Sequence, residues 1–228
     1  TPALTATTSY WARATNVGGS ADSTTATVTI TAGPTAINLA NYVRVGRYNL
    51  PEPTRTALPA GTPASNLLGQ EASGVTYNWD TDTLFIVGDG GRSVTQVSKT
   101  GQLINTMTLA LRTGAPQGTD FYDPEAITYL GGGQFVMTEE RDRQLVKFTY
   151  AAGTTLARAG AQTVKLGTFD DNTGTEGLSW DPQTNGFIVL KEKTPIGVFQ
   201  TGVDFAAGTA TNGSPTAANS TNLFETAK

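Results

Sequence analysis

The chain has 228 residues and a mass of 23.8 kDa, with 15% charged residues, a net charge of -4 and a pI near 4.8. Its Lys and Arg residues form no basic run, which argues against a nucleic-acid partner held through phosphate contacts. His and Cys are both absent, so the commonest general base, thiolate nucleophiles, disulfides and zinc–thiolate sites are excluded, and no apolar run approaches the roughly 18 residues that span a bilayer.

Abundant Thr, Ala, Ser and Gly, combined with few charges and no Cys, are typical of secreted bacterial surface proteins. We therefore expect an extracellular location, either secreted or at the cell surface, with the periplasm as the alternative. The sequence begins at Thr1 rather than at Met, so we expect it to be processed or to be a piece of a longer polypeptide.

The first 32 residues contain two β-rich runs, 10–15 and 26–31, on either side of the turn sequence NVGGS. The second run alternates Thr with Val and Ile, the pattern of a half-buried strand. A lone hairpin is unstable in water. Tyr10, Ala14, Asn16 and Gly19 resemble the end of bacterial immunoglobulin-like repeats, which implies that residues 1–32 are the last strands of such a β-sandwich. A Thr-rich stalk that happens to alternate is the other interpretation.

Residues 33–41 are expected to be a linker, because Gly33 and Pro34 interrupt any regular structure. A strand is predicted at 42–51, followed by a loop rich in Pro, Ala, Thr and Gly up to about residue 66.

From Gln70 onward the sequence repeats a pattern of first strand, turn and second strand three times. The first strands align at Gly74, Ala126 and Gly177, which are 52 and 51 residues apart, and the second strands align as LFIV, FVMT and FIVL. Four strands in about 50 residues is the repeat of a β-propeller blade. The expected fold is therefore all-β, a β-propeller of four-stranded blades, and the alternative β-sandwich does not explain the period.

The predicted propeller domain covers residues 42–228, with the strand at 42–51 as the outer strand of a ring-closing blade and about three further blades. Because closure needs four or more blades, we expect the polypeptide to continue beyond Lys228. An open arrangement with its edges covered by partners is the alternative, which exposed strand edges disfavour.

Three motifs in this region resemble those of the SdiA-regulated proteins, a family of bacterial secreted or periplasmic β-propellers. They are SGV at 73–75, DPEAI at 123–127 with FVMTEER at 135–141, and EGL at 176–178 with KEK at 191–193, Pro195 and Gly197. The resemblance runs from about residue 42 to 199 and implies a shape related to six-bladed, calcium-dependent phosphotriesterase-like propellers. Ala126 departs from the family's usual glycine, and the later blades are missing.

This fold brings acidic residues together. The first and second strands of a blade are antiparallel, so the start of one and the end of the other lie on the same face of the disc. Glu125 and Glu176 stand at the starts of first strands, and Asp89, Glu140 and Glu192 stand at the ends of second strands. We therefore predict at least five carboxylates at one mouth of the channel, where they repel one another unless something neutralises them.

Three ways of neutralising these acids remain open. Ca²⁺ takes six to eight oxygen ligands, and the lack of His and Cys favours it over zinc or copper; the resemblance to phosphotriesterase-like propellers implies Ser73, Glu125 and Glu176 as its ligands. Backbone N–H groups of the neighbouring blade are a second way to hold Glu125 and Glu176. Local ion pairs are the third, in which Asp89 would pair with Arg92, Glu140 with Arg141 and Arg143, and Glu192 with Lys191 and Lys193.

Other conspicuous residues receive structural interpretations. Four acids are read as turn formers, namely Asp80, Asp82, Asp123 and Asp181. Three aromatic residues at equivalent positions are read as inter-blade packing rather than a sugar-stacking row, namely Tyr77, Tyr129 and Trp180.

Two functions are compatible with these patterns. The favoured one is an extracellular module on immunoglobulin-like stalks, acting as an adhesin, matrix component or surface-fibre subunit, with neighbouring immunoglobulin-like domains, copies of itself or a surface ligand as partners. The alternative is a calcium-assisted ester, lactone or phosphoester hydrolase, with Glu140 as general base. The lack of a His base and of a G-x-S-x-G motif favours the module, and the fold by itself does not decide.

Overall fold

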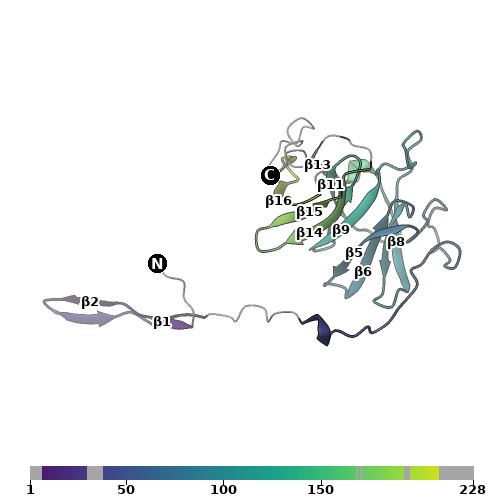
Figure 1. Cartoon of the computed structure of the whole chain (residues 1–228). Coiled ribbons are helices and arrows are strands. Elements are labelled where there is room, and N and C mark those ends of the chain that lie inside the picture. Colours follow the sequence, from purple (N-terminus) through teal and green to yellow (C-terminus); the bar gives the residue numbers. More distant parts are fainter. Residues whose placement is uncertain (1–6, 30–37, 168, 170–171, 193–195, 211–228) are drawn as a thin grey trace. The chain divides into compact units, whose positions relative to one another are not determined.

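The structure is a computed structural model that describes residues 7–29, 38–167, 169, 172–192 and 196–210. It divides into two units, residues 1–45 and 46–228, which are described separately (Figure 1). The helical elements in the described residues are two short 3₁₀ turns, η1 (Leu39–Asn41) and η2 (Arg158–Gly160). A helix with the length and apolarity to cross a membrane is not among them.

The N-terminal unit is a hairpin whose strands are β1 (Thr8–Tyr10), β2 (Arg13–Asn16), β3 (Gly19–Asp22) and β4 (Ala26–Val28). Strand β2 pairs with β3 around a two-residue turn, and β1 pairs with β4. The predicted hairpin is present, but its strands differ from the prediction, because residues 19–22 form a strand of their own.

Nearly every side chain of these four strands is exposed. Since they enclose no core among the described residues, their origin in an immunoglobulin-like sandwich stays a prediction. Residues 30 and 31 of the second predicted run lie outside the described residues.

The second unit consists of three sheets that follow one another along the chain; they are antiparallel, except that the short strand β12 (Thr155–Leu156) adds a parallel fifth strand to the first sheet. The first blade contains β5 (Ala72–Asn78), β6 (Thr83–Gly88), β7 (Ser93–Val97) and β8 (Leu103–Leu109). The second contains β9 (Pro124–Gly131), β10 (Gln134–Glu139), β11 (Gln144–Thr149) and β13 (Gln162–Lys165). The third contains β14 (Thr175–Asp181), β15 (Gly186–Lys191), β16 (Gly197–Asp204) and β17 (Thr209–Ala210).

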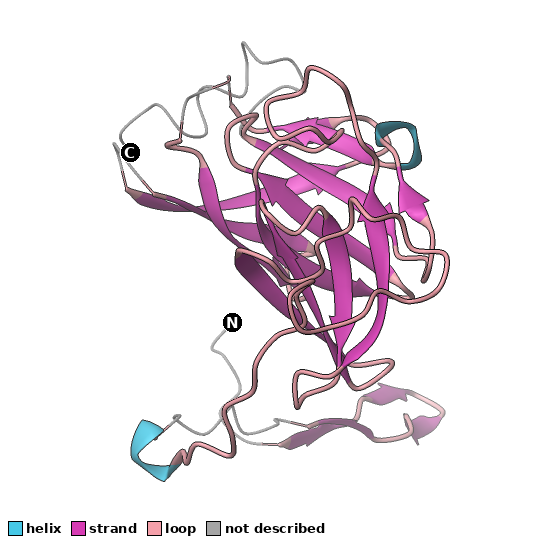
Figure 2. Ribbon diagram, turned by 90° about the vertical axis from the view of Figure 1, so that its right-hand side faces the viewer, coloured by secondary structure: helices cyan, strands magenta, loops and turns pink. Residues whose placement is uncertain are grey.

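These sheets confirm the predicted fold class, because each repeat unit of the sequence forms one four-stranded blade. The backbone repeats as well: Arg92 and Arg143, 51 residues apart, both take a left-handed conformation with φ of 48° and 44°. Figure 2 shows the long strands of this unit stacked in layers, with connecting loops at their ends.

The predicted strand at 42–51 is wrong, because the described structure contains no strand between η1 and β5. Val43 and Val45 are 80% and 91% exposed. An apolar alternation does not form a strand unless a neighbouring strand takes its backbone hydrogen bonds.

The blades pack face to face, with the second between the other two. On β10, Phe135 and Met137 pack in one buried cluster with the first blade, while Val136 packs in another with the third. On β15, in contrast, Ile188 and Leu190 are 37% and 44% exposed. The middle blade is therefore buried on both faces, so its second strand is apolar without alternation.

The first strands β5, β9 and β14 lie next to one another, with β9 in the middle (Figure 1). The same hydrogen bond joins each pair: Tyr129 N donates to Thr76 Oγ1 at 3.1 Å, and Trp180 N donates to Thr128 Oγ1 at 3.1 Å. The approach is close enough that a Cβ on Gly74 would lie 2.8 Å from Ala126 Cα, which explains the glycine in the SGV motif.

Candidate metal centre

The ends of the strands assemble two groups of three carboxylates. One group is Asp89, Asp123 and Glu125, and the other is Glu140, Glu176 and Glu192. Within each group one carboxylate oxygen per residue lies within 4.8 Å of the others. Each group joins the acid that follows the second strand of one blade to the acid near the start of the first strand of the next blade.

The two groups are electrostatically connected. The charge of Glu176 acts on both Glu125 and Glu140, and a hydrogen bond links Glu140 to Asp123. The predicted convergence of Asp89, Glu125, Glu140, Glu176 and Glu192 at one end of the blades is therefore what the structure shows.

Burial raises the pKa of Glu125 to about 7, because its charged form loses hydration; a hydrogen bond from Ser73 lowers the pKa, and the charges of Glu176, Asp123 and Asp89 raise it further. Burial also raises the pKa of Glu140 to about 7. For Glu140 the N–H of Gly174 lowers the pKa, and the hydrogen bond and charge of Asp123 together with the charge of Glu176 raise it. Both glutamates are therefore partly protonated near neutral pH unless a cation neutralises the negative charge of the carboxylates around them.

The structure brings the three ligands implied by the family resemblance, Ser73, Glu125 and Glu176, to the same end of the blades, but they do not form one group. Ser73 hydrogen-bonds Glu125, whereas Glu125 and Glu176 belong to different groups of three. Their role as metal ligands stays a prediction.

Asp123 is the member of the site that sequence reasoning missed. It takes a left-handed conformation with φ of 59°, as a turn residue does, but its side chain is 4% exposed and forms an ion pair with Arg141. Gln117 Nε2 donates a second hydrogen bond to it at 2.7 Å. The sequence signal for Asp123 was its position directly before Pro124 and Glu125. That signal does not repeat as an aspartate, because the equivalent positions in the other blades are Glu71 and Gly174.

Two arginines next to these acids make contacts that the sequence did not predict. Asp89 and Arg92 form no ion pair among the described residues, so that pairing is wrong; Arg92 lies in a left-handed turn, where its carbonyl accepts a hydrogen bond from Leu109 N. Arg141 pairs with Asp123 and also donates to Asn172 Oδ1 at 2.8 Å. Lys193 lies outside the described residues.

The neighbouring blade's backbone holds Glu140, an acid for which the sequence did not predict this contact. Gly174 N, at the entry to the third blade, donates to Glu140 Oε1 at 3.1 Å, whereas Glu125 accepts no backbone N–H among the described residues. A Cβ on Gly174 would lie 1.9 Å from the carbonyl oxygen of Glu140. This contact therefore needs glycine and joins the second blade to the third.

Glu139, next to Glu140, has a structural role that is separate from the mouth. Its fully buried carboxylate accepts hydrogen bonds from Tyr122 N at 2.6 Å and Gln144 Nε2 at 2.5 Å, and it pairs with Arg158 at 2.6 Å. The guanidinium of Arg158 lies 4.4 Å from the centre of the Phe121 ring. All its acceptor positions are used inside the fold, so Glu139 is not available to a ligand.

The donor set of the mouth fits a hard cation. It offers carboxylate and hydroxyl oxygens and, because the chain has no His or Cys, no soft ligand. Ca²⁺–oxygen distances of 2.3–2.6 Å place ligands on opposite sides of the ion about 4.6–5.2 Å apart. The carboxylate oxygens of each group lie within 4.8 Å of one another, so none of their separations exceeds the upper end of that range.

The sequence profile of the SdiA-regulated family matches residues 56–226. Similar solved structures include a hydrazine synthase from Kuenenia stuttgartiensis, with a TM-score of 0.40 and 12% identity over 61% of this chain and 36% of the other. A catalytically inactive virginiamycin B lyase from Staphylococcus aureus has a TM-score of 0.35 and 12% identity over 58% and 41%. A glutaminyl cyclase from Myxococcus xanthus has a TM-score of 0.39 and 16% identity over 61% and 59%.

The chain thus spans between 36% and 59% of the lengths of these three proteins. The family profile, in contrast, covers most of this chain, and it covers all three blades with both groups of acids. The chain belongs to the SdiA-regulated family of β-propellers.

Proposed function

We propose that this chain is an extracellular binding module whose acidic mouth takes up calcium as a structural ion. The observation that carries the proposal is the repetition of the carboxylate group at two successive blade junctions. A cation at each group would neutralise acids from two blades at once, and so would hold the blades together.

The state of the mouth without a cation supports this role. Glu125 and Glu140, whose pKa values are raised to about 7, are partly ionised at neutral pH next to other carboxylates. A bound cation removes that repulsion, and its binding energy adds to the stability of the folded state.

Binding is favoured over catalysis because the acids of the mouth are engaged in the fold. Glu140, the candidate general base, is 2% exposed and its carboxylate contacts Gly174 N and Asp123. The chain also has no His and no Cys that could serve as a general base or nucleophile. The surface location, the adhesin, matrix or fibre role and the immunoglobulin-like neighbours belong to the same proposal, and they rest on the composition and on residues 1–32.

A calcium-assisted hydrolase remains the second candidate, because one observation favours it. A carboxylate with a pKa near 7 is matched to proton transfer at neutral pH, and Glu140 has such a pKa. A panel of carboxyl esters, lactones and phosphoesters, assayed with calcium and with chelator, separates the candidates: turnover that Glu140→Gln abolishes would establish the enzyme.

Calcium binding is tested by thermal unfolding of the full chain, with chelator and with millimolar calcium. At a calcium concentration of about 100 Kd the ion stabilises the fold by about 2.7 kcal/mol, which raises the Tm by about 5–10 °C for a domain of this size. Glu125→Gln and Glu176→Gln are each expected to reduce this rise strongly.

The matched control is Asp82→Asn, which changes an acid that pairs with Lys99 in the turn after β5, at the opposite end of that strand from Ser73, and should keep the full calcium response. In chelator, the two mouth variants should be at least as stable as the unmodified chain, because they remove repulsion; this separates loss of a ligand from misfolding. An equal Tm with and without calcium would rule out the metal proposal.

A further inference from the structure

A cavity lies between the second and third blades, away from the acidic mouth. Its volume is about 550 Å³, within the range of pockets that hold small ligands. Leu130 and Trp180, which line it, stand near the ends of β9 and β14, whereas Glu125 and Glu176 stand near the starts of the same strands. The cavity is therefore separate from the candidate metal centre.

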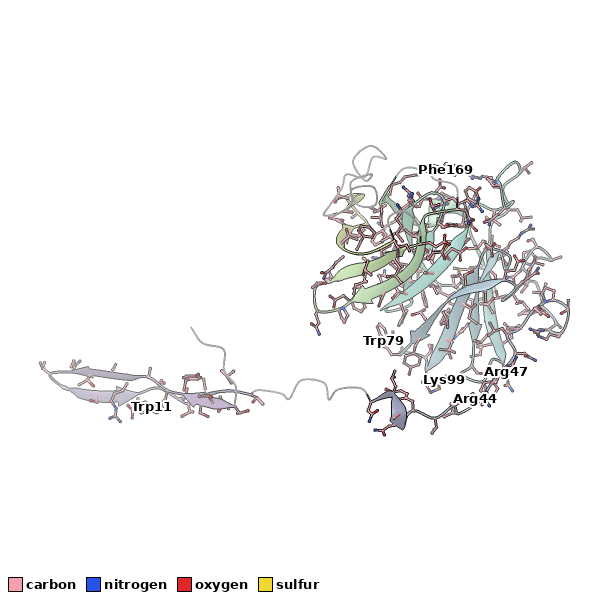
Figure 3. All side chains as sticks on the ribbon, in the orientation of Figure 1. Trp11, Arg44, Arg47, Trp79, Lys99 and Phe169 are labelled. Carbon is pink, nitrogen blue, oxygen red and sulfur yellow. The ribbon has the colours of Figure 1, made fainter. Side chains whose placement is uncertain are left out.

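Aromatic rings form part of its wall. Trp180 and Phe205 line it together with Phe187, whose ring meets that of Phe205 edge-on at 6.0 Å. The ring of Trp180 is nearly parallel to that of Trp79, with centres 6.2 Å apart and 21° between the planes. Trp79 is 49% exposed and lies at the opposite end of the propeller unit from Phe169 (Figure 3). The two indoles thus extend the aromatic surface from the cavity to the outside.

Polar side chains with unused hydrogen-bonding capacity line the rest of the cavity. Within the described part of the chain, the side chains of Lys147, Gln162 and Asn185 make no hydrogen bond or ion pair, and all three line the cavity. Asp204 also lines it and uses one carboxylate oxygen, Oδ1, to accept the backbone N–H groups of Ala206 and Ala207, each at 2.9 Å. Two amides, an ammonium and a carboxylate oxygen are therefore available to a ligand.

This combination selects one chemical class. The two amide residues are exposed, and an apolar ligand lying over them would displace their water without replacing its hydrogen bonds, which costs free energy. A phosphate or other strong anion would find a single cation, Lys147, opposed by Asp204. A neutral sugar fits both kinds of wall, since the C–H face of a pyranose packs on an aromatic ring and its hydroxyls both donate and accept, as amide side chains do.

We propose that this cavity binds a neutral pyranose unit of an oligosaccharide, with Trp180 as its stacking platform. The proposal gives a ligand to the binding role proposed above and does not involve calcium. It also assigns to Trp180 a ligand contact besides the inter-blade packing expected from the sequence.

The test uses Trp180 as its own reporter. The chain has three tryptophans, so Trp11→Phe together with Trp79→Phe leaves Trp180 as the sole indole. Cellotetraose, maltotetraose and the tetramer of N-acetylglucosamine are titrated into the full chain, and an array of neutral glycans is screened in parallel. A saturable change in Trp180 emission with at least one probe is expected, in calcium and in chelator alike.

Variants of the polar wall locate the binding. Gln162→Ala, and Asn185→Gly, which suits the left-handed conformation at Asn185, should each weaken binding by about tenfold, the effect of one lost hydrogen bond. Gln134→Ala is the matched control, because Gln134 is an exposed glutamine of the same blade outside the cavity, and it should bind like the unmodified chain.

Absence of a saturable signal with every probe and on the glycan array would overturn the proposal, as would binding that Gln162→Ala and Asn185→Gly leave unchanged. Binding of peptides but not of glycans would overturn the ligand class. Loss of the calcium response with glycan binding intact, or the reverse, shows which of the two proposals fails.

Discussion

The junction between the first and second blades and the junction between the second and third share a polar framework but differ in packing. Both contain a threonine that accepts the N–H of an aromatic residue in the next blade, and both contain a group of three acids. At the first junction Phe85, Tyr129, Phe135 and Tyr150 lie with ring centres 4.5–6.3 Å apart. At the second a cavity of about 550 Å³ remains.

This difference shows that the polar framework and the side-chain packing of a junction have separate origins. The backbone repeat sets the polar framework, since it returns the threonine and two of the three acids of each group to the same register every 51 or 52 residues. The packing depends on side chains that the repeat does not fix. A filled junction stabilises the unit, whereas an incompletely filled one leaves room for a ligand.

The largest expected effect comes from the two equivalent phenylalanines of the second strands. Phe135→Ala removes a fully buried ring from the filled junction and should lower the free energy of unfolding by about 4–5 kcal/mol. Phe187→Ala enlarges an existing cavity that Phe187 already lines, so a smaller loss of about 3 kcal/mol is expected. Urea unfolding of both variants measures the difference, and equal losses would show that the junctions are packed alike.

The next effect concerns the ion pair between Arg158 and Glu139, which lies beside Phe121 of the hydrophobic cluster shared by the first two blades. Arg158→Ala removes the partner of Glu139, whose carboxylate is 0% exposed, and should cost about 3 kcal/mol because a buried charge is left uncompensated. The double variant Arg158→Ala with Glu139→Gln should recover part of this loss. If urea unfolding shows the single variant to be as stable as the unmodified chain, the pair has no structural role.

A dependence on pH tests whether both acid groups behave alike. The pKa values of Glu125 and Glu140 are raised to about 7 in the folded chain, so between about pH 4.5 and 7 the folded state holds more protons than the unfolded state. Stability in chelator should therefore fall as pH rises through this window. Allowing for solvent screening, the fall is about 1.5 kcal/mol, or 3–6 °C in Tm.

Glu125→Gln and Glu140→Gln should each flatten part of this slope. If only one of the two variants changes the slope of stability against pH, the repulsion is restricted to one junction. A Tm that rises with pH would contradict the raised pKa values.

The smallest effect compares the two threonine bonds. Thr76→Val leaves the N–H of Tyr129, a residue 1% exposed, without an acceptor, and should cost about 1.5 kcal/mol. Thr128→Val affects Trp180, which is partly exposed beside the cavity, so water can replace the lost acceptor and less than about 1 kcal/mol is expected. Hydrogen exchange at the two amides checks this order; faster exchange at Trp180 than at Tyr129 in the unmodified chain is expected too.

The sequence predicted the blades and the meeting of the acids because both follow from strand direction and a constant period. Glu125 and Asp89, for example, are 36 positions apart and belong to successive blades. Antiparallel pairing brings the end of each second strand to the start of its own first strand, and the first strands β5 and β9 lie side by side in the same register, so both acids reach one face. Asp123 could not be recognised in this way, since a left-handed turn residue and a buried ion-pair partner have the same sequence signature.

Other features depend on contacts that are distant in sequence. The strand predicted at 42–51 failed because a strand also needs a partner, and the pairing of Asp89 with Arg92 failed because proximity in sequence does not fix side-chain direction. The cavity could not be foreseen, because it results from the sizes of side chains on six different strands and two turns.

One small element, β12 (Thr155–Leu156), lies in the connection between β11 and β13 and runs parallel to β8 at the outer edge of the first blade. Thr108 N and Ala110 N donate to Thr154 O and Leu156 O at 2.9 and 2.8 Å. An outer strand with unsatisfied backbone groups invites strand addition by other chains. The second blade thus protects the rim of the first against aggregation, and exchanging these few residues for a shorter connection would expose it.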